Sequence, residues 1–308
     1  FLKGNRVFLT LVVLTFLSFS YLSIPYSYDK NELQLELKNQ LLEKFTMNFI
    51  LSENLNYNFF PSPHFTFEDT SIIEKQSKLS DIKKLKVFIS FKNIFTLKNI
   101  TIKKIILENA NFDITKENFN FFINILDNNI SEYGVLIKDS NIFFRNSQQE
   151  MLFVNRIENI RYHYNPKNSI NILTSYSEIF NTPYLIELQN DKINKKLFLK
   201  IDSKSIKLKI ENELDYSNDI KTGLLNNFYK NKKNITSYEL KKNSLNFLSL
   251  KKELYKDIFY SGLINFKPFF LNTEINTNEL DLSYLFNSNS FFLELLKTKI
   301  LDNKNLNI

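Results

Sequence analysis

The spacing of apolar and polar residues changes along this chain, and each spacing predicts a different element. The first stretch, residues 7–24, reads VFLTLVVLTFLSFSYLSI and contains no charged side chain. At about 1.5 Å rise per residue, a helix of this length spans roughly 27 Å, which is close to the hydrocarbon thickness of a bilayer. The pattern therefore predicts a membrane-spanning helix at 7–24.

Basic residues on one side of this stretch predict its orientation. Lys3 and Arg6 precede it, and basic flanks stay in the cytoplasm, so residues 1–6 are expected there and residues 25–308 across the membrane. A cleaved signal peptide is the alternative, because it also has a basic start and an apolar core. We favour a retained anchor, since a signal core has only about 7–15 residues and the apolar stretch here continues to Ile24.

A second helix is expected after Pro25. Leu33, Leu37, Leu41 and Phe45 recur every four residues, with charged or amide side chains between them. This is the spacing of one face of an amphipathic helix, which we expect to end near Phe45.

From Thr46 onward the period becomes two, which is typical of strands with one buried face. The clearest strand is Ser205–Glu213, where Ile206, Leu208 and Ile210 alternate with charged residues. Further strands are expected at 54–60, 65–73, 84–91, 103–108, 111–114, 133–138, 141–145, 158–164, 170–176, 184–189 and 195–201.

Short links and scarce helices favour an antiparallel meander. Asn109-Ala110 and Asp139-Ser140 are expected to link neighbouring strands. Phe119–Leu126 is the clearest helix in this part, and further helices are expected at 220–229, 244–260 and 280–297.

About a dozen strands then carry an apolar face, while few amphipathic helices are present to cover them. Such a face must be buried, so the sheet curls on itself, forms a sandwich, or lines a groove that holds an apolar ligand. We predict a mainly β fold with a few helices, in which a curled antiparallel sheet forms a hydrophobic groove. At about 4.8 Å between strands, such a groove would be roughly 60 Å long.

Composition narrows the function classes. The net charge of +7 suggests an anionic partner, but the lysines are scattered singly or in pairs among acids, which favours a solvated surface; no nucleic-acid partner is expected. The absence of cysteine excludes disulfides, thiolate zinc sites and cysteine nucleophiles. Because the chain starts at Phe1 and ends in a polar stretch, we expect a fragment.

No catalytic constellation is visible. The only histidines, His64 and His163, are nearly a hundred residues apart, and each is expected to be solvated. No metal-binding spacing or nucleophile elbow occurs, and four scattered glycines cannot form a phosphate loop. Asp113 and Glu117 fit helix capping. We expect no enzyme activity, catalytic residue, cofactor or metal.

Four segments carry a resemblance to a known family: LELKNQLLEKF, then MNFILSENLNYNFFPSPHFTFEDTSI with Pro61 and Pro63, then LSDIKKLKVFISFKNIFTLKNITIKKIILENANFDI, and EYGVLIKDSNIFFRN. Together with the apolar helix, they resemble the N-terminal region of AsmA-family proteins up to about residue 145. After residue 150 only the strand-rich character agrees. The chain departs from the family in its scarce alanine and glycine, and its turn KFTMNF lacks the usual glycine.

The resemblance implies a single-pass inner-membrane protein with its bulk in the periplasm. The family is not known for enzyme activity and is similar to bridge-like lipid-transfer proteins, whose curled sheets form a hydrophobic groove. We therefore expect phospholipid as the ligand, accommodated or moved between inner and outer membrane in support of outer-membrane biogenesis and cell-envelope homeostasis, with envelope proteins as partners. The alternative is a periplasmic scaffold that assists outer-membrane protein assembly.

The candidate residues that line the groove are the apolar members of the alternating stretches. They are Leu85, Val87, Ile89, Phe91, Ile170, Ile172, Tyr184, Ile186, Leu188, Ile206, Leu208 and Ile210.

Overall fold

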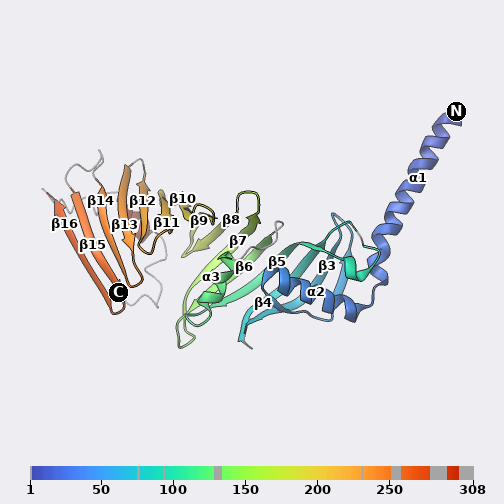
Figure 1. The fold of residues 1–308 in the computed structure, drawn as a ribbon, viewed down its shortest axis with the longest axis horizontal. Coiled ribbons are helices and arrows are strands. Elements are labelled where there is room, and N and C mark those ends of the chain that lie inside the picture. The colour runs from blue at the N-terminus through green and yellow to red at the C-terminus, as the bar shows by residue number, and fades with distance from the viewer. Residues whose placement is uncertain are drawn as a thin grey trace. The chain divides into compact units, whose positions relative to one another are not determined.

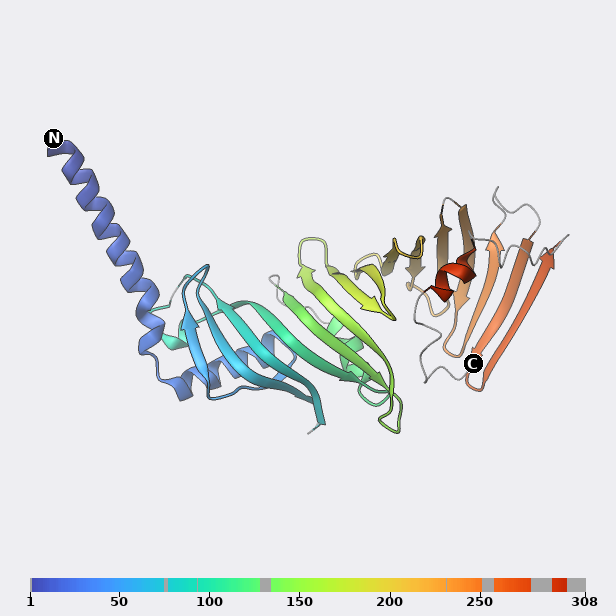
Figure 2. The same ribbon diagram turned by 180° about the vertical axis from the view of Figure 1, so that it is seen from behind.

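A computed structural model describes residues 2–74, 77–92, 94–127, 134–230, 232–250, 258–277 and 290–297. It is mainly β, with an apolar helix at the N-terminus (Figures 1 and 2). The strand pairs among the described residues are antiparallel, and the strand order follows the chain from β3 (His64–Glu74) to β16 (Phe269–Thr277). Strand β1 (Asn48–Ile50) precedes β3 in this order, and it is not paired with β16 at the other end, so the sheet is open. The predicted mainly β, antiparallel fold class is confirmed.

Contacts divide the chain into two compact units. The first contains residues 1–114 and 118–140, and the second contains residues 115–117 and 141–308. Strand β6 (Val135–Arg145) carries residues of both units.

The first unit combines helices with a short meander of strands. Its helices are α1 (Leu2–Ser23), α2 (Lys30–Phe45) and α3 (Phe119–Asp127), with 3₁₀ turns η1 (Ile24–Ser27) and η2 (Leu97–Asn99). Its strands are β1 (Asn48–Ile50), β2 (Leu55–Asn58), β3 (His64–Glu74), β4 (Ser77–Ile89) and β5 (Ile102–Ile114). Both β1 and β2 pair with β3.

Helix α1 contains the apolar stretch found in the sequence. The segment Arg6–Ser27 contains a window with a mean hydropathy of 2.2, and none of that window is buried inside the described chain. It is the one helix among the described residues that is long and apolar enough to cross a membrane.

Helix α2 begins and ends at recognisable local signals. The side chain of Asp29 accepts hydrogen bonds from the main-chain N–H groups of Asn31 and Glu32, which caps the N-terminus. The helix ends at Phe45, and the next residue, Thr46, has a left-handed φ of 55°. Threonine thus takes the conformation that glycine usually supplies at this position.

The core of the first unit lies between α2 and one face of β3–β5. Figures 1 and 2 show α2 across that face. Its apolar stripe, Leu33, Leu37, Leu41 and Phe45, is at most 2% exposed, as the spacing predicts. The sheet contributes residues that share one face by register and are at most 1% exposed: Phe65, Phe67, Leu85, Val87, Ile105 and Leu107.

Two predicted links are not turns. Asn109 and Asp139 lie inside the continuous strands β5 and β6, each with a positive φ, 53° and 47°. The pairing of β4 with β5 skips Asn109. Asparagine and aspartate tolerate the left-handed conformation, so these residues form local irregularities within strands rather than hairpin turns.

The second unit is almost entirely β. After β7 (Met151–Asn165) come β8 (Ile170–Ile179), β9 (Thr182–Asp191), β10 (Lys196–Ser203), β11 (Leu208–Asp215), β12 (Lys221–Tyr229), β13 (Lys232–Leu240), β14 (Ser244–Leu250), β15 (Ile258–Phe266), β16 (Phe269–Thr277) and the helix α5 (Phe291–Leu296).

Two helices predicted in this unit are wrong. Residues 220–229 and 244–260 contain β12, β14 and the start of β15 instead. Both segments have adjacent apolar residues, such as Leu224 and Leu225, which suit a helix stripe but here point to opposite faces of a strand. Of the helix predicted at 280–297, only residues 290–297 are described, and they contain α5.

Candidate functional site

The register of the second unit separates its strand residues into two faces. Residues directly opposite one another on neighbouring strands share a face, and successive residues alternate. One continuous row contains Leu173, Leu188, Leu199, Asn212 and Leu225. We call the face that carries this row the uncharged face.

The uncharged face contains almost no formal charge. Between β8 and β14 its only charged residues are Lys221 and Lys232, which are the first residues of β12 and β13. The other positions are leucine, isoleucine, phenylalanine, tyrosine, asparagine, serine, threonine and Gly223.

The opposite face, which we call the charged face, carries every other charged strand residue of β8–β14. Opposite charges are paired there. Lys200 and Glu187 lie directly across from each other with 3.1 Å between Nζ and Oε2, and Lys196 is 2.9 Å from Glu213. Partly exposed pairs of this kind are worth about 0–1 kcal/mol each, so they fit a solvated surface more than a core.

Burial follows the same division. Every buried residue in the described strands of the second unit lies on the uncharged face. Ile157 and Tyr162 are the apolar members, and the polar ones are Asn155, Asn171, Ser175, Ser177, Ser203, Thr236 and Ser249. No strand residue described on the charged face of β8–β14 is buried. The sheet of this unit therefore curves around its uncharged face.

A ladder of tyrosine–asparagine hydrogen bonds crosses the uncharged face. Each tyrosine hydroxyl reaches past one strand to the side-chain oxygen of an asparagine. The pairs and their distances are Tyr184 to Asn155, 2.8 Å; Tyr216 to Asn190, 2.7 Å; Tyr238 to Asn212, 2.8 Å; and Tyr260 to Asn234, 3.2 Å.

Small residues sit below these rings. Tyr238 passes over Gly223, where an added Cβ would lie 2.2 Å from the ring. Tyr184 lies directly opposite Ser177, and the main-chain N–H of Tyr260 donates to the hydroxyl of Ser249 at 2.9 Å. The rings therefore lie along the sheet and cover its main chain with aromatic surface.

Sequence reasoning missed this ladder, although a signal for it exists. Asn190, Asn212 and Asn234 recur every 22 residues. The tyrosine bonded to each lies 26 residues further along the chain in all three cases. The period equals one hairpin of two strands with their turns, so hairpins β9–β10, β11–β12 and β13–β14 are related as a repeat.

Burial makes two of the ladder hydroxyls weaker acids. It raises the pKa of Tyr184 to about 12 and raises the pKa of Tyr238 above its ordinary value. Both hydroxyls consequently remain protonated and act as donors at neutral pH.

The candidate residues of the first unit do not form an open surface. Leu85, Val87 and Ile89 are at most 3% exposed and belong to the core that α2 covers, so a ligand would have to displace α2 to reach them. Phe91 lies beyond the end of β4 and is 53% exposed.

The candidates of the second unit are divided between its faces. Tyr184, Ile186, Leu188, Leu208 and Ile210 share the uncharged face. Ile170 and Ile172 lie on the charged face, because they are opposite Asp191 and Gln189. Ile206 is not in a strand, since residues 204–207 form the turn between β10 and β11.

The histidines are held by aromatic and polar neighbours. His64 is buried, stacks on Phe88 with 4.7 Å between ring centroids, and pairs through Nδ1 with the carbonyl of Ser62, so the predicted solvation is wrong there. His163 lies on the charged face, half-buried, and its pKa is lowered by burial and by Arg161. No group of three metal-ligating side chains occurs in the part of the chain that the structure describes.

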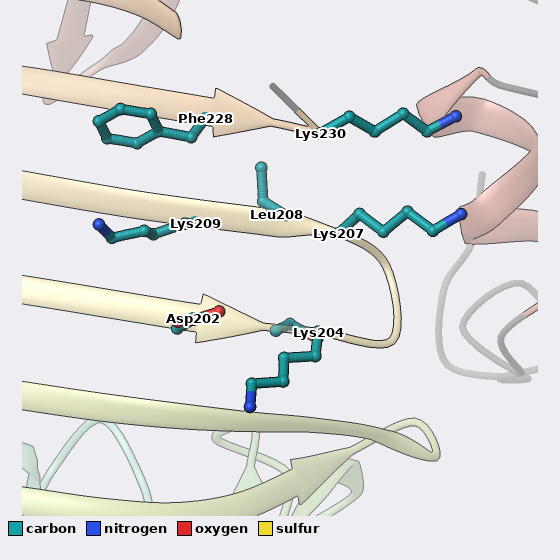
Figure 3. Close-up of a pocket in the computed structure, with 8 residues that line it drawn as sticks. Asp202, Lys204, Lys207, Leu208, Lys209, Phe228 and Lys230 are labelled. Carbon is teal, nitrogen blue, oxygen red and sulfur yellow. The ribbon is translucent and has the colours of Figure 1, made fainter. Parts of the chain in front are cut away.

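A lysine-lined cavity occurs at the turns of β10–β12 (Figure 3). Lys207 and Lys230 point together toward α5, whereas Lys204 and Lys209 point elsewhere. Lys207 lies 3.5 Å from Glu294 of α5. Bonding to Lys297 and the charge of Lys207 lower the pKa of Glu294. The lysines do not converge on one point, so the cluster fastens α5 rather than forming an anion site.

Neither a scan against protein-family models nor a search of curated proteins finds a match to this chain.

Proposed function

We propose that this chain is a single-pass, inner-membrane-anchored periplasmic protein of AsmA type that accommodates or transfers phospholipid. In this proposal α1 is the anchor, residues 1–6 are cytoplasmic, and the sheet of the second unit provides the lipid-contacting surface. The protein would thereby support outer-membrane biogenesis and cell-envelope homeostasis.

The uncharged face is the observation that carries the proposal. Leucine and isoleucine side chains recur along the rows of this face, with tyrosine, asparagine, serine and threonine between them, and offer an uncharged, largely apolar path across successive strands. Each acyl CH₂ removed from water is worth about 0.8 kcal/mol, so a lipid leaves a membrane readily only if its chains stay covered. A path that crosses many strands without a charge meets this requirement.

Photo-crosslinking tests the proposal with a matched pair on one strand. Leu173 lies on the uncharged face of β8, and its neighbour Ile172 lies on the charged face. A photoreactive residue at position 173 is expected to capture phospholipid in cells several-fold more than one at position 172. Equal labelling at both positions would contradict lipid contact through the uncharged face.

The same experiment addresses the scaffold alternative, in which the chain assists outer-membrane protein assembly. A scaffold would give protein adducts rather than lipid adducts at position 173. Native mass spectrometry after gentle extraction then adds a second readout, because a lipid-transfer protein retains bound phospholipid and a scaffold does not.

A further inference from the structure

Tyrosine hydroxyls fasten the end of α1 to strand β2 and to the loop between β4 and β5. Tyr57 donates a hydrogen bond to the carbonyl of Leu22 at 2.8 Å, and Tyr21 donates to the carbonyl of Phe91 at 2.7 Å. Tyr28, just beyond the helix, donates to the carbonyl of Ile94. The carbonyl of Leu22 is among the last four of α1, which lack a partner in the following turn of an α-helix. Tyr57 thus caps the helix from the sheet.

Aromatic rings extend this connection. Phe59, in the loop 59–63 between β2 and β3, packs edge-on against Phe19 with 5.8 Å between ring centroids. Phe95, in the loop between β4 and β5, packs against Tyr21 at 4.9 Å. These ring contacts therefore hold both loops in place beside the last turns of α1.

The same loops expose large apolar side chains. Phe60 is 81% exposed, Phe95 is 69% exposed and Phe91 is 53% exposed. These three side chains, with the rings that join them to α1, are called the aromatic collar here. By contrast, Ile94 in the same loop is fully buried, with 0% of its surface exposed. An exposed cluster of large apolar side chains is unfavourable in water and marks an interaction surface.

The position of the collar along α1 identifies what covers it. Phe19 and Tyr21 lie within roughly 8 Å of the end of the apolar stretch 7–24, and the rings beside them share that level. This is the depth at which aromatic side chains gather at a membrane interface. The loops also contain no acidic residue, while Lys92 and Lys98 follow the exposed rings, which suits anionic lipid phosphates.

We propose that the aromatic collar is a second membrane contact, in which Phe60, Phe91 and Phe95 insert into the interfacial layer of the bilayer that α1 spans. The inference rests on the anchoring role of α1 and is independent of lipid transfer. The collar fixes the first unit against the membrane, so the start of the sheet is held at the lipid surface.

Tryptophan fluorescence tests the collar directly, because the chain contains no tryptophan. The full chain, carrying Phe60→Trp or Phe95→Trp, is reconstituted into phosphatidylcholine vesicles whose acyl chains are brominated either near the headgroup or near the bilayer centre. Both variants are expected to emit at shorter wavelength than in water. Bromines near the headgroup are expected to quench them about twofold or more beyond bromines at the centre.

Phe119→Trp is the matched control. Phe119 is 47% exposed in the same unit, but it follows the far end of β5, and that strand is roughly 40 Å long. Its tryptophan is expected to remain in water and unquenched. A further variant, Phe16→Trp within α1, reports on the anchor itself.

The outcomes separate the collar from the anchor. Quenching of Phe16→Trp without quenching of Phe60→Trp and Phe95→Trp would overturn the collar and leave the anchor intact. Absence of quenching at Phe16→Trp would overturn both. Because Phe60 is exposed, its replacement by tryptophan should not disturb the fold. Circular dichroism checks that each variant retains its β-sheet.

Discussion

The hydroxyl of Tyr238 on β13 donates a hydrogen bond to Oδ1 of Asn212 on β11, 2.8 Å away across the intervening strand. The ring crosses β12 at Gly223, where the lack of a side chain leaves room for it. One residue without a Cβ thus permits a hydrogen bond between two strands that are not neighbours. The ladder couples successive hairpins through side chains as well as through the main chain.

Gly223→Ala is expected to destabilise the second unit by about 1–3 kcal/mol, the usual cost of overpacking. The new Cβ would lie 2.2 Å from Cζ of Tyr238, so the ring must move and its bond to Asn212 breaks. Urea unfolding of the full chain in detergent measures the loss. In the Tyr238→Ala background the same glycine substitution should cost little, and fully additive losses would show that the ring does not restrict this position.

Gly262→Ala is expected to cost more than Gly223→Ala. Its Cβ would lie 2.5 Å from the main-chain oxygen of Asn272, in addition to 2.4 Å from the ring of Phe247. A ring can rotate away, but a paired strand cannot move without loss of its ladder. Removal of the ring by Phe247→Ala should therefore fail to rescue this variant, and a full rescue would contradict the clash with the main chain.

Tyr184→Phe tests the ladder through its pH dependence. At pH 8 the variant is expected to lose about 1 kcal/mol, because the buried Oδ1 of Asn155 loses its donor. The pKa of Tyr184 is raised to about 12 in the folded state, against about 10 when unfolded. The stabilisation is therefore complete below pH 10 and is lost between pH 10 and 12.

The measurement is unfolding of both proteins at pH 8, 10 and 11. The stability advantage of wild type over Tyr184→Phe should fall by up to about 1.4 kcal/mol per pH unit above 10, so that it closes or reverses by about pH 11. Both proteins contain all the other tyrosines, so their contribution drops out of the stability difference. A difference that stays constant up to pH 11 would show that the hydroxyl of Tyr184 is not protected by folding.

Local signals explain which parts of the fold were predictable. The stripe Leu33, Leu37, Leu41 and Phe45 determines a helix within one segment, and the structure places α2 there. The charge-free stretch 7–24 is equally local. In β12, by contrast, Leu224 and Leu225 point to opposite faces, so the segment lacks a clear alternation and its state depends on pairing with β11 and β13.

The candidate surface was less predictable because it depends on register. The segment INILTSYS of β8 has apolar residues in both alternations, and only its pairing with β9 places Leu173 beside Leu188 and Ile172 beside Gln189. Leu85 and Val87 alternate like surface-lining residues, but the sequence does not reveal that α2 covers them. The 22-residue interval between Asn190, Asn212 and Asn234 is visible in the sequence. Only the structure shows that each asparagine accepts a hydrogen bond from a tyrosine two strands away.

Leu37→Ala tests the core beneath α2. Leu37 is fully buried, and its truncation is expected to cost about 2–5 kcal/mol through lost burial and the cavity left behind. Leu35 is two residues away on the same helix and 62% exposed, so Leu35→Ala should change stability by no more than about 0.5 kcal/mol. Hydrogen exchange of β3–β5 amides is the readout, and similar protection in the two variants would contradict the assignment of α2 as the cover of this face.

Leu225→Glu and Leu224→Glu place the same charge on opposite faces of β12. Leu225 lies on the uncharged face in the row with Asn212 and Thr236, whereas Leu224 lies on the charged face between Glu213 and Ser237. A carboxylate at position 225 would have to be desolvated by any acyl chain that passes it, which is strongly unfavourable. We therefore expect phospholipid that co-purifies with the chain to fall several-fold in Leu225→Glu and to remain near wild type in Leu224→Glu. Phosphorus content per mole of protein is the measurement, and near-UV circular dichroism confirms that both variants are folded.

If both variants retain phospholipid, or if both lose it equally, the uncharged face is not the lipid path. A selective loss at position 225 in a folded chain would instead identify the sheet of the second unit as the surface that holds the acyl chains.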